Sequence, residues 1–147
     1  FYEESSKIPV IIRYPKEIKQ SITNSNAKVS TIDIMPTLLD LAGVEIPKGI
    51  DGRSFKKQIL ESEVSTNEFD IVFSQNQFGR MVRYDQFKYV RSVVYGITYE
   101  ILYDIDNDPN ESKNLLDDPK FKNQLIKGRK LLDDWLVNEG TDLIAER

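Results

Sequence analysis

Hydrophobic and polar positions alternate most clearly in the second half of the chain. Between residues 69 and 105, short apolar or β-branched runs are separated by turn signals such as Asp85-Gln86. This alternation predicts strands at Phe69–Ser74, Met81–Tyr84, Phe87–Val94 and Tyr99–Ile105. Strands joined by turns this short form an antiparallel meander.

A longer apolar period follows the predicted sheet. From about Pro119, apolar residues and one glycine recur at spacings of three and four, at Phe121, Leu125, Gly128, Leu132 and Trp135. Such spacing indicates one face of a helix, and Asp118 is predicted to cap it. This apolar stripe must be covered, and the sheet is the expected partner. Residues 61–147 are therefore predicted to form an α+β subdomain, with the C-terminal helix packed on a four-stranded antiparallel sheet.

The first 60 residues have a different pattern. Pro9–Tyr14 is an apolar, β-branched run closed by Pro15, which is typical of a strand buried on both faces. Polar stretches at Lys16–Lys28 and Glu61–Asn67 are predicted to be loops.

Two helices are predicted between these loops. The first spans Asp33–Ala42, with Asp33 as its N-cap and Gly43 at the C′ position, where a left-handed backbone is common. Ser54 is predicted to cap a second, short helix that ends at Leu60.

Composition narrows the possible functions. The chain has 147 residues, of which 39% are hydrophobic and 30% charged, as in a globular protein. The net charge of −4 gives no basic surface for nucleic acid. No apolar run approaches the roughly 20 residues of a membrane span. The chain has no cysteine and no histidine, so thiol chemistry and histidine catalysis are excluded. Adjacent carboxylates on a helix do not face each other, and no catalytic residue is predicted.

One acidic stretch superficially matches a calcium-binding loop, with aspartates at alternate positions: Asp104, Asp106 and Asp108. The sixth loop position needs glycine but holds Pro109, and the twelfth needs glutamate but holds Leu115. No metal site is therefore predicted. Asp108 is instead expected to start a helical turn, with Glu111 completing a capping box.

Positive charge gathers on the two middle predicted strands, at Arg80, Arg83, Lys88 and Arg91. These residues either meet an anionic ligand or pair with neighbouring acids. Both interpretations stay open at this point.

Three stretches follow one another along the chain: YEESSKIPVIIRYP at Tyr2–Pro15, then STIDIMPTLLDLAGVEIP followed by GIDGRSF, then RMVRYDQFKYVRS followed by LYDIDNDPNESKNL. Taken together, they resemble the C-terminal portion of sulfatases of the alkaline phosphatase superfamily. The first stretch resembles the segment after the last active-site lysine of these enzymes, the second their next helix and loop, and the third their C-terminal subdomain. The resemblance covers nearly the whole chain in the expected order.

The resemblance implies a division of the chain. Residues 1–60 would be a strand and helices from the C-terminal end of the large catalytic α/β domain, truncated here, and residues 61–147 would be the subdomain. The partner would be the missing N-terminal catalytic portion. The parent enzyme, periplasmic or secreted, would hydrolyse a sulfated substrate with calcium and a formylglycine made within C/S-x-P-x-R. That motif is absent here, so this chain is expected to hold no cofactor and to be inactive alone.

In such enzymes the subdomain commonly forms one wall of the substrate cleft. The candidates for this role lie at the predicted loop between the first two strands: Gln75, Asn76 and Arg80. Packing or solvent exposure would explain the same residues.

Two other functions stay open. The parent could be a phosphonate or phosphate ester hydrolase, or the chain could be a non-enzymatic interaction module, although an apolar strand such as Pro9–Tyr14 argues against the latter. The sequence leaves open which ester is cleaved.

Overall fold

The computed structural model describes residues 1–18, 27–60 and 70–139. The chain forms two compact units. One contains Phe1–Ile8 and Phe73–Arg147, and the other contains Pro9–Val72. In the described ranges, no helix is long and apolar enough to cross a lipid bilayer. The predicted division at residue 60 refers to a domain of the parent enzyme and stays a prediction. The predicted loop Glu61–Asn67 lies outside the described residues, as do positions 19–26 of the predicted loop Lys16–Lys28.

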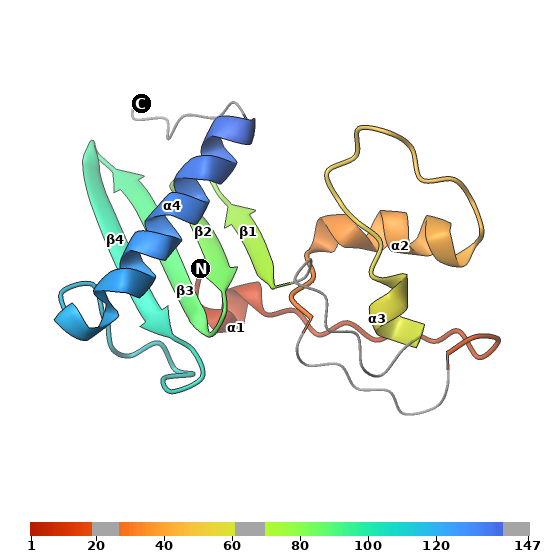
Figure 1. Ribbon diagram of the computed structural model, residues 1–147, viewed down its shortest axis with the longest axis horizontal. Helices are drawn as coiled ribbons and strands as arrows, with labels where there is room; N and C mark the ends of the chain where they lie inside the picture. The colour runs from red at the N-terminus through yellow and green to blue at the C-terminus, as the bar shows by residue number, and fades with distance from the viewer. Residues whose placement is uncertain (19–26, 61–69, 140–147) are drawn as a thin grey trace. The chain divides into compact units, whose positions relative to one another are not determined.

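The predicted antiparallel sheet is confirmed (Figure 1). Its strands follow one another in the order β1 (Ile71–Gln75), β2 (Gly79–Tyr84), β3 (Phe87–Val94) and β4 (Ile97–Asp104). Two-residue turns join the last three strands, so Tyr84 pairs with Phe87 and Val94 with Ile97. The predicted start of the first strand, Phe69, lies outside the described residues.

The turn between β3 and β4 has the geometry that a tight hairpin needs. Tyr95 has a φ of 51° and Gly96 a φ of 75°. Positive φ at both central residues is the requirement of a type I′ turn, whose twist matches that of the flanking strands. Tyr95 is 98% exposed, so its side chain contributes little to the core.

The strand register separates two faces of the sheet. On one face, Val82, Tyr89 and Leu102 form a row across three strands, and all three are fully buried. The next row on this face contains Tyr84 and Phe87, which are also buried. This apolar face needs a partner because burial of such side chains is the main stabilising contribution to folding.

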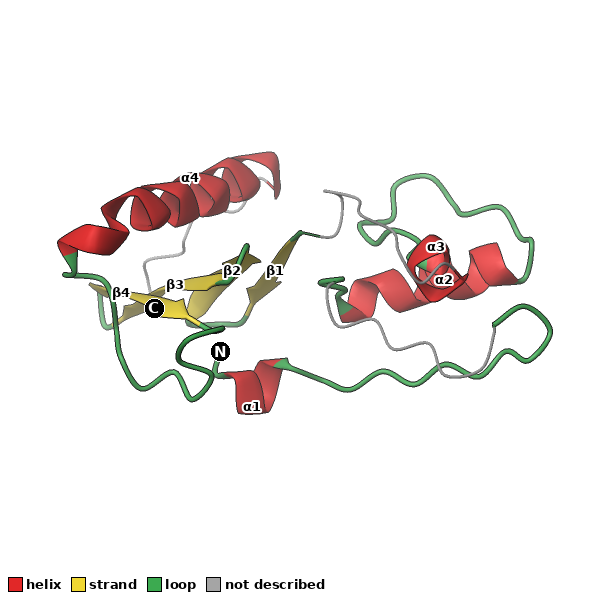
Figure 2. Ribbon diagram, turned by 60° about the horizontal axis from the view of Figure 1, so that its bottom comes forward, coloured by secondary structure: helices red, strands yellow, loops and turns green. Residues whose placement is uncertain are grey.

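Helix α4 (Lys122–Glu139) covers that face, after a 3-10 turn at Pro119–Phe121, η3 (Figure 2). Asp118 caps the segment, because its carboxylate accepts a hydrogen bond from the Lys120 amide at 3.0 Å. The predicted stripe faces the sheet: Leu125, Gly128 and Leu132 are buried, whereas Phe121 and Trp135 are half-buried. Leu136 is also buried, which the stripe did not include.

Gly128 allows α4 to approach the sheet closely. A Cβ atom at this position would lie 2.7 Å from the Tyr84 hydroxyl and 2.9 Å from Cβ of Tyr89. The Tyr84 hydroxyl donates a hydrogen bond to the carbonyl of Gln124 at 2.6 Å. Burial raises the pKa of Tyr84, so this hydroxyl stays protonated as a donor.

The N-terminal segment lies against the opposite face of the sheet, where Figure 2 shows the short helix α1 (Glu3–Ser6). The rings of Tyr2 and Tyr103 have centroids 6.3 Å apart. Tyr103 pairs with Lys88 across β3 and β4, so both residues belong to this face. The sequence patterns did not predict α1.

In the second unit, the predicted helices are present as α2 (Ile34–Leu41), after a 3-10 turn η1 (Thr31–Asp33), and α3 (Lys56–Leu60). Gly43 has a φ of 69° and ends α2 as predicted, while the amide of Val44 donates to the carbonyl of Leu39. The hydroxyl of Ser54 accepts from the Lys56 amide at 3.2 Å, which agrees with its predicted capping role.

Asp33 is the N-cap of α2, as predicted, but its side chain makes no capping hydrogen bond to that helix, because Asp33 is also the last residue of η1. Its carboxylate accepts hydrogen bonds from the amides of Ser30 at 2.8 Å and Arg53 at 2.9 Å. The hydroxyl of Thr37 accepts from the Phe55 amide at 3.0 Å. The loop before α3 is therefore fastened to the start of α2, which explains why a buried carboxylate is tolerated here.

The strand predicted at Pro9–Tyr14 is wrong for this chain. These residues have no regular secondary structure, and Ile11 is 93% exposed. A strand needs a hydrogen-bonded neighbour, and none pairs with this segment among the described residues. The apolar, β-branched run at Pro9–Tyr14 favours a buried strand, but in this chain the segment is not buried in a sheet.

The capping box predicted at Asp108–Glu111 is also wrong. A single turn forms, in which the Glu111 amide donates to the Asp108 carbonyl at 3.0 Å, but no helix follows. The carboxylate of Glu111 instead reaches the N-terminal segment and Lys88. The ion pair with Lys88 therefore forms in place of a local helix cap, which would have contributed about 1 kcal/mol of stability.

Candidate functional site

The three residues predicted for a cleft wall lie at the β1–β2 connection. Gln75 is the exposed last residue of β1. The side-chain oxygen of Asn76 accepts hydrogen bonds from the amides of Phe78 and Gly79, both at 2.9 Å. Asn76 therefore stabilises the turn, and the three residues are close together because the hairpin brings β1 and β2 side by side.

Arg80 lies directly beside this turn. Its Nη1 donates to the carbonyl of Asn76 at 2.7 Å and to that of Gly79 at 3.0 Å. Its Nε is buried and has no hydrogen-bond partner among the described residues. A guanidinium offers five donors, so this group has capacity beyond its two contacts to the turn. A cation beside an exposed, hydrogen-bonded turn is suited to an anionic ligand.

The four cations of the middle strands do not form one patch. Arg80 pairs with Arg91 on the face covered by α4, whereas Arg83 pairs with Lys88 on the other face. Arg91 lies 2.6 Å from a carboxylate oxygen of Asp133, and Arg83 lies 3.9 Å from Asp106. Of the two interpretations left open, pairing with acids therefore holds for Arg83, Lys88 and Arg91, and the interpretation of Arg80 as a contact for an anionic ligand stays open.

A network around Glu100 joins β4 to α4. Arg129 binds the Glu100 carboxylate with two hydrogen bonds, at 2.8 Å and 2.5 Å, and this bidentate contact lowers the pKa of Glu100. The Tyr89 hydroxyl donates to the same carboxylate. Burial, together with that contact, raises the pKa of Tyr89 to about 12. Every group here is paired within the fold, so the network holds the helix and offers no nucleophile.

A second charged cluster lies on the opposite face. The ammonium group of Lys88 is 2.6 Å from a carboxylate oxygen of Glu3 and 2.8 Å from one of Glu111. Only about 1% of the Lys88 side chain is exposed. In the sequence, Lys88 stands out only as one of four cations, and this cluster was not predicted. The signal that could have found it is that Glu3, Lys88 and Glu111 each lie in a stretch that resembles the same family: YEESS, QFKYV and DPNES.

In the acidic stretch at the end of β4, the carboxylates of Asp104 and Asp108 accept hydrogen bonds that form turns. The Asp104 carboxylate accepts from Gln86 and from the side chain of Asn107, each at 2.9 Å. Burial alone would raise the pKa of Asp104, but these hydrogen bonds outweigh it and lower the pKa. Asp108 accepts from the amide of Lys113 at 2.8 Å. Residues 1–18, 27–60 and 70–139 contain no group of three or more acidic or metal-ligating side chains arranged to hold a metal ion. This stretch does not fit a calcium site.

We therefore expect calcium to bind Asp104–Asp108 no more tightly than about 1 mM, the affinity of the weakest extracellular modules. The reason is that carboxylates already used as hydrogen-bond acceptors would have to break these contacts to bind the ion. Titration calorimetry of the chain with calcium checks this expectation. Micromolar binding that disappears in Asp106→Ala would contradict it.

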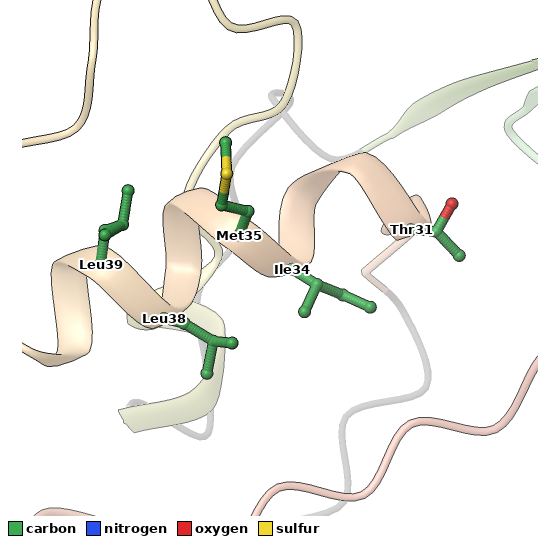
Figure 3. Close-up of a pocket in the computed structure, with 5 residues that line it drawn as sticks. All are labelled: Thr31, Ile34, Met35, Leu38 and Leu39. Carbon is green, nitrogen blue, oxygen red and sulfur yellow. The ribbon is translucent and has the colours of Figure 1, made fainter.

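The second unit presents an apolar surface on α2. A shallow hollow is lined by five residues of the η1–α2 segment (Figure 3): Thr31, Ile34, Met35, Leu38 and Leu39. Ile34, Met35 and Leu38 are exposed. A helix that buries one stripe and also exposes apolar residues is typical of a segment with a further packing partner.

Comparison with known proteins identifies the class of chain to which these features belong. Residues 1–135 match the family described as "N-sulphoglucosamine sulphohydrolase, C-terminal". A delta 4,5-hexuronate-2-O-sulfatase of Bacteroides thetaiotaomicron is 32% identical over 97% of this chain and 31% of its own length. An ulvan-active sulfatase of Formosa agariphila is 29% identical over 95% of this chain and 34% of its own length. The chain therefore spans about a third of the length of these relatives.

Solved structures share the fold as well, among them the following two. One protein, solved in complex with its substrate D-glucosamine-2-N,6-O-disulfate, is 26% identical with a TM-score of 0.67 over 86% of this chain and 27% of its own. The phosphonate monoester hydrolase of Agrobacterium radiobacter is 25% identical with a TM-score of 0.54, over 69% of this chain and 23% of its own.

Proposed function

Since the chain belongs to the sulfatase family, of which it forms the C-terminal region, we propose that it completes the fold of a sulfuric ester hydrolase and supplies one wall of its substrate cleft. The observation that carries the proposal is the family match over residues 1–135, in a chain about a third as long as the sulfatases it resembles. The catalytic groups then belong to the N-terminal portion of the parent enzyme, because this chain has no cysteine, no histidine and no C/S-x-P-x-R motif.

The proposed substrate is a sulfated saccharide. The relatives are named for a sulfated hexuronate and for ulvan, and one structural neighbour holds a disulfated glucosamine. On this chain the proposed contact is the β1–β2 turn, with Gln75, Asn76 and Arg80. Arg80 supports this assignment because its guanidinium is fixed by two backbone carbonyls and keeps donors that can bind a sulfate oxygen.

The proposed partner is the N-terminal catalytic portion of the same enzyme. Ile8, Val10 and Ile11 are apolar and exposed in a segment without regular structure, and the apolar residues of α2 are exposed as well. A strand of the parent sheet adjacent to Pro9–Tyr14 would satisfy its backbone hydrogen bonds and bury these side chains. The resemblance implies calcium and a formylglycine in that portion, where they would supply Lewis-acid and nucleophilic chemistry, and the residues of this chain take no part in it.

A phosphonate or phosphate ester hydrolase is the second candidate, favoured by the likeness to the Agrobacterium enzyme. The two candidates share the fold of this region and differ in the nucleophile upstream. Rates of the parent enzyme on a sulfate monoester and a phosphonate monoester with the same leaving group separate them, since the preferred ester identifies the reaction.

We expect the 147-residue chain alone to show no hydrolysis of 4-nitrophenyl sulfate or of a 6-O-sulfated glucosamine above background. The reason is that the nucleophile and the metal ligands implied by the family lie outside it. The measurement compares this chain, with calcium present, with a longer chain that includes the catalytic portion. Turnover by the short chain that survives repurification would overturn the assignment of catalysis to the upstream portion.

A further inference from the structure

Lys88 has an unusual environment for a lysine. Its ammonium group, about 1% exposed, donates to the carbonyl of Phe1 at 2.8 Å and to Glu111 at 2.8 Å, and it lies 2.6 Å from Glu3. An ammonium has three donors, and here three oxygen atoms surround it. Buried lysines need such complete pairing because an unpaired charge in a low-dielectric interior is strongly destabilising.

Glu111 connects this lysine to the start of α1. One carboxylate oxygen accepts from Lys88, and the other accepts from the Glu3 amide at 2.5 Å. Glu111 is buried and has a φ of 52°, a left-handed conformation that is costly for a residue other than glycine. Such a conformation persists where its surroundings hold it, and the two hydrogen bonds provide that hold.

The cluster joins segments that are far apart in the sequence. Glu3 and Glu111 are 108 residues apart, and Lys88 and Phe1 are 87 apart. Phe1–Ile8 belongs to the unit of the sheet, whereas from Pro9 onward the chain belongs to the other unit. The three charged residues therefore fix the segment through which the chain passes from one unit into the other.

We propose that Lys88 is a positioning residue, which with Glu3 and Glu111 holds Phe1–Ile8 on the sheet and thereby orients the catalytic portion relative to the subdomain wall. The inference rests on the proposed function for its catalytic consequence only, since the clamp itself stands on distances within this chain. No substrate contact is assigned to Lys88. Its effect on the reaction acts through the segment that it holds.

Native-state hydrogen exchange of the 147-residue chain tests the clamp. Lys88→Met keeps the length of the side chain and removes its charge, which leaves the buried Glu111 carboxylate and the partly buried Glu3 carboxylate without their ammonium partner. We expect the amides of Glu3, Ser6 and Lys7 to exchange at least about tenfold faster in this variant, relative to amides of α4. Unchanged exchange at these three amides would overturn the proposal.

Lys127→Met is the matched control. Lys127 lies 2.6 Å from Asp85, the same distance as that between Lys88 and Glu3, but both side chains of this pair, Lys127 and Asp85, are about half exposed. Exposed pairs contribute little, so exchange in Phe1–Ile8 should change by less than about twofold. If Trp135 fluorescence shows that Lys88→Met does not fold, the Glu3→Gln variant is used in its place in the exchange experiment. This substitution removes one charge and keeps the Lys88–Glu111 pair. At least a roughly threefold rise at the same amides is then expected, and no rise would overturn the proposal.

Kinetics of the parent enzyme on a sulfated saccharide test the positioning role. We expect Lys88→Met to lower kcat by about tenfold or more with KM within about twofold, because misplaced reacting groups slow the chemical step without removing a substrate contact. An equal loss in Lys127→Met, or a change in KM alone, would overturn this role. If the unmodified parent does not hydrolyse sulfate esters, the proposed function fails, while the exchange result still decides whether the clamp exists.

Discussion

Leu132→Ala is expected to lower the free energy of unfolding by about 2–5 kcal/mol, the range for a leucine removed from a well-packed core. Leu132 is fully buried in α4, on the side of the helix that contacts β2 and β3. The loss combines the transfer of its side chain with the cavity left between helix and sheet. Urea unfolding of the 147-residue chain, followed by circular dichroism and by Trp135 fluorescence, measures it.

Val137→Ala is the control on the same helix. Val137 is 78% exposed, so its truncation removes few contacts and should change stability by no more than about 0.5 kcal/mol. A Leu132→Ala variant as stable as Val137→Ala would mean that α4 is not docked on this face. A domain with about 5–15 kcal/mol of stability would lose much of it through Leu132 alone.

The sheet and α4 were predictable because their signals are local. Two-residue turns flanked by β-branched runs determine the β2–β3 and β3–β4 hairpins without reference to the rest of the chain. The apolar spacing through Leu125, Gly128 and Leu132 likewise specifies one face of α4. A helix stripe and a sheet with one apolar face have few ways to bury both, so the α+β packing follows from the two patterns together.

The errors arise where distant residues decide the conformation. Glu111 was expected to complete a capping box with Asp108. Its carboxylate instead accepts hydrogen bonds from Lys88 and from the Glu3 amide, which are distant in the sequence. The pattern at Pro9–Tyr14 predicts a buried strand, but Ile11 is 93% exposed in this chain, and a strand forms only beside another strand. Neither outcome is encoded in the neighbouring residues, so periodicity could not supply it.

The candidate site was predictable only in part. Gln75, Asn76 and Arg80 were selected because they lie at a loop, and the hairpin does bring Asn76 and Arg80 together. Their role in a cleft stays a prediction. Lys88 shows a different limit: a strand lysine between apolar neighbours reads as a surface cation until its partners from two other segments are known.

Trp135→Ala is the second substitution with a large expected effect, about 3 kcal/mol of lost stability. Trp135 is half-buried, and its ring stacks on Phe73 of β1 with centroids 4.9 Å apart and planes 6° apart. The value lies at the lower end of the roughly 3–5 kcal/mol range for a large aromatic residue because part of the ring already meets solvent. Thermal and urea unfolding of the variant beside the unmodified chain measure it.

A double-mutant cycle with Phe73→Ala isolates the stacking. An aromatic pair contributes about 0.5–1.5 kcal/mol of stability beyond the effect of buried area. The double variant should therefore lose less stability, by that amount, than the sum of the losses in the two single variants. Tyr95→Ala is the matched control, since Tyr95 is an aromatic residue that is 98% exposed and its loss should leave stability within about 0.5 kcal/mol. Additive costs for Trp135 and Phe73 would mean that the rings do not stack in solution. Because β1 ends at Gln75 and leads directly into the turn at Asn76, loss of this contact should also loosen the proposed cleft wall. The parent enzyme carrying Trp135→Ala should therefore be less active, although no substrate contact is proposed for Trp135.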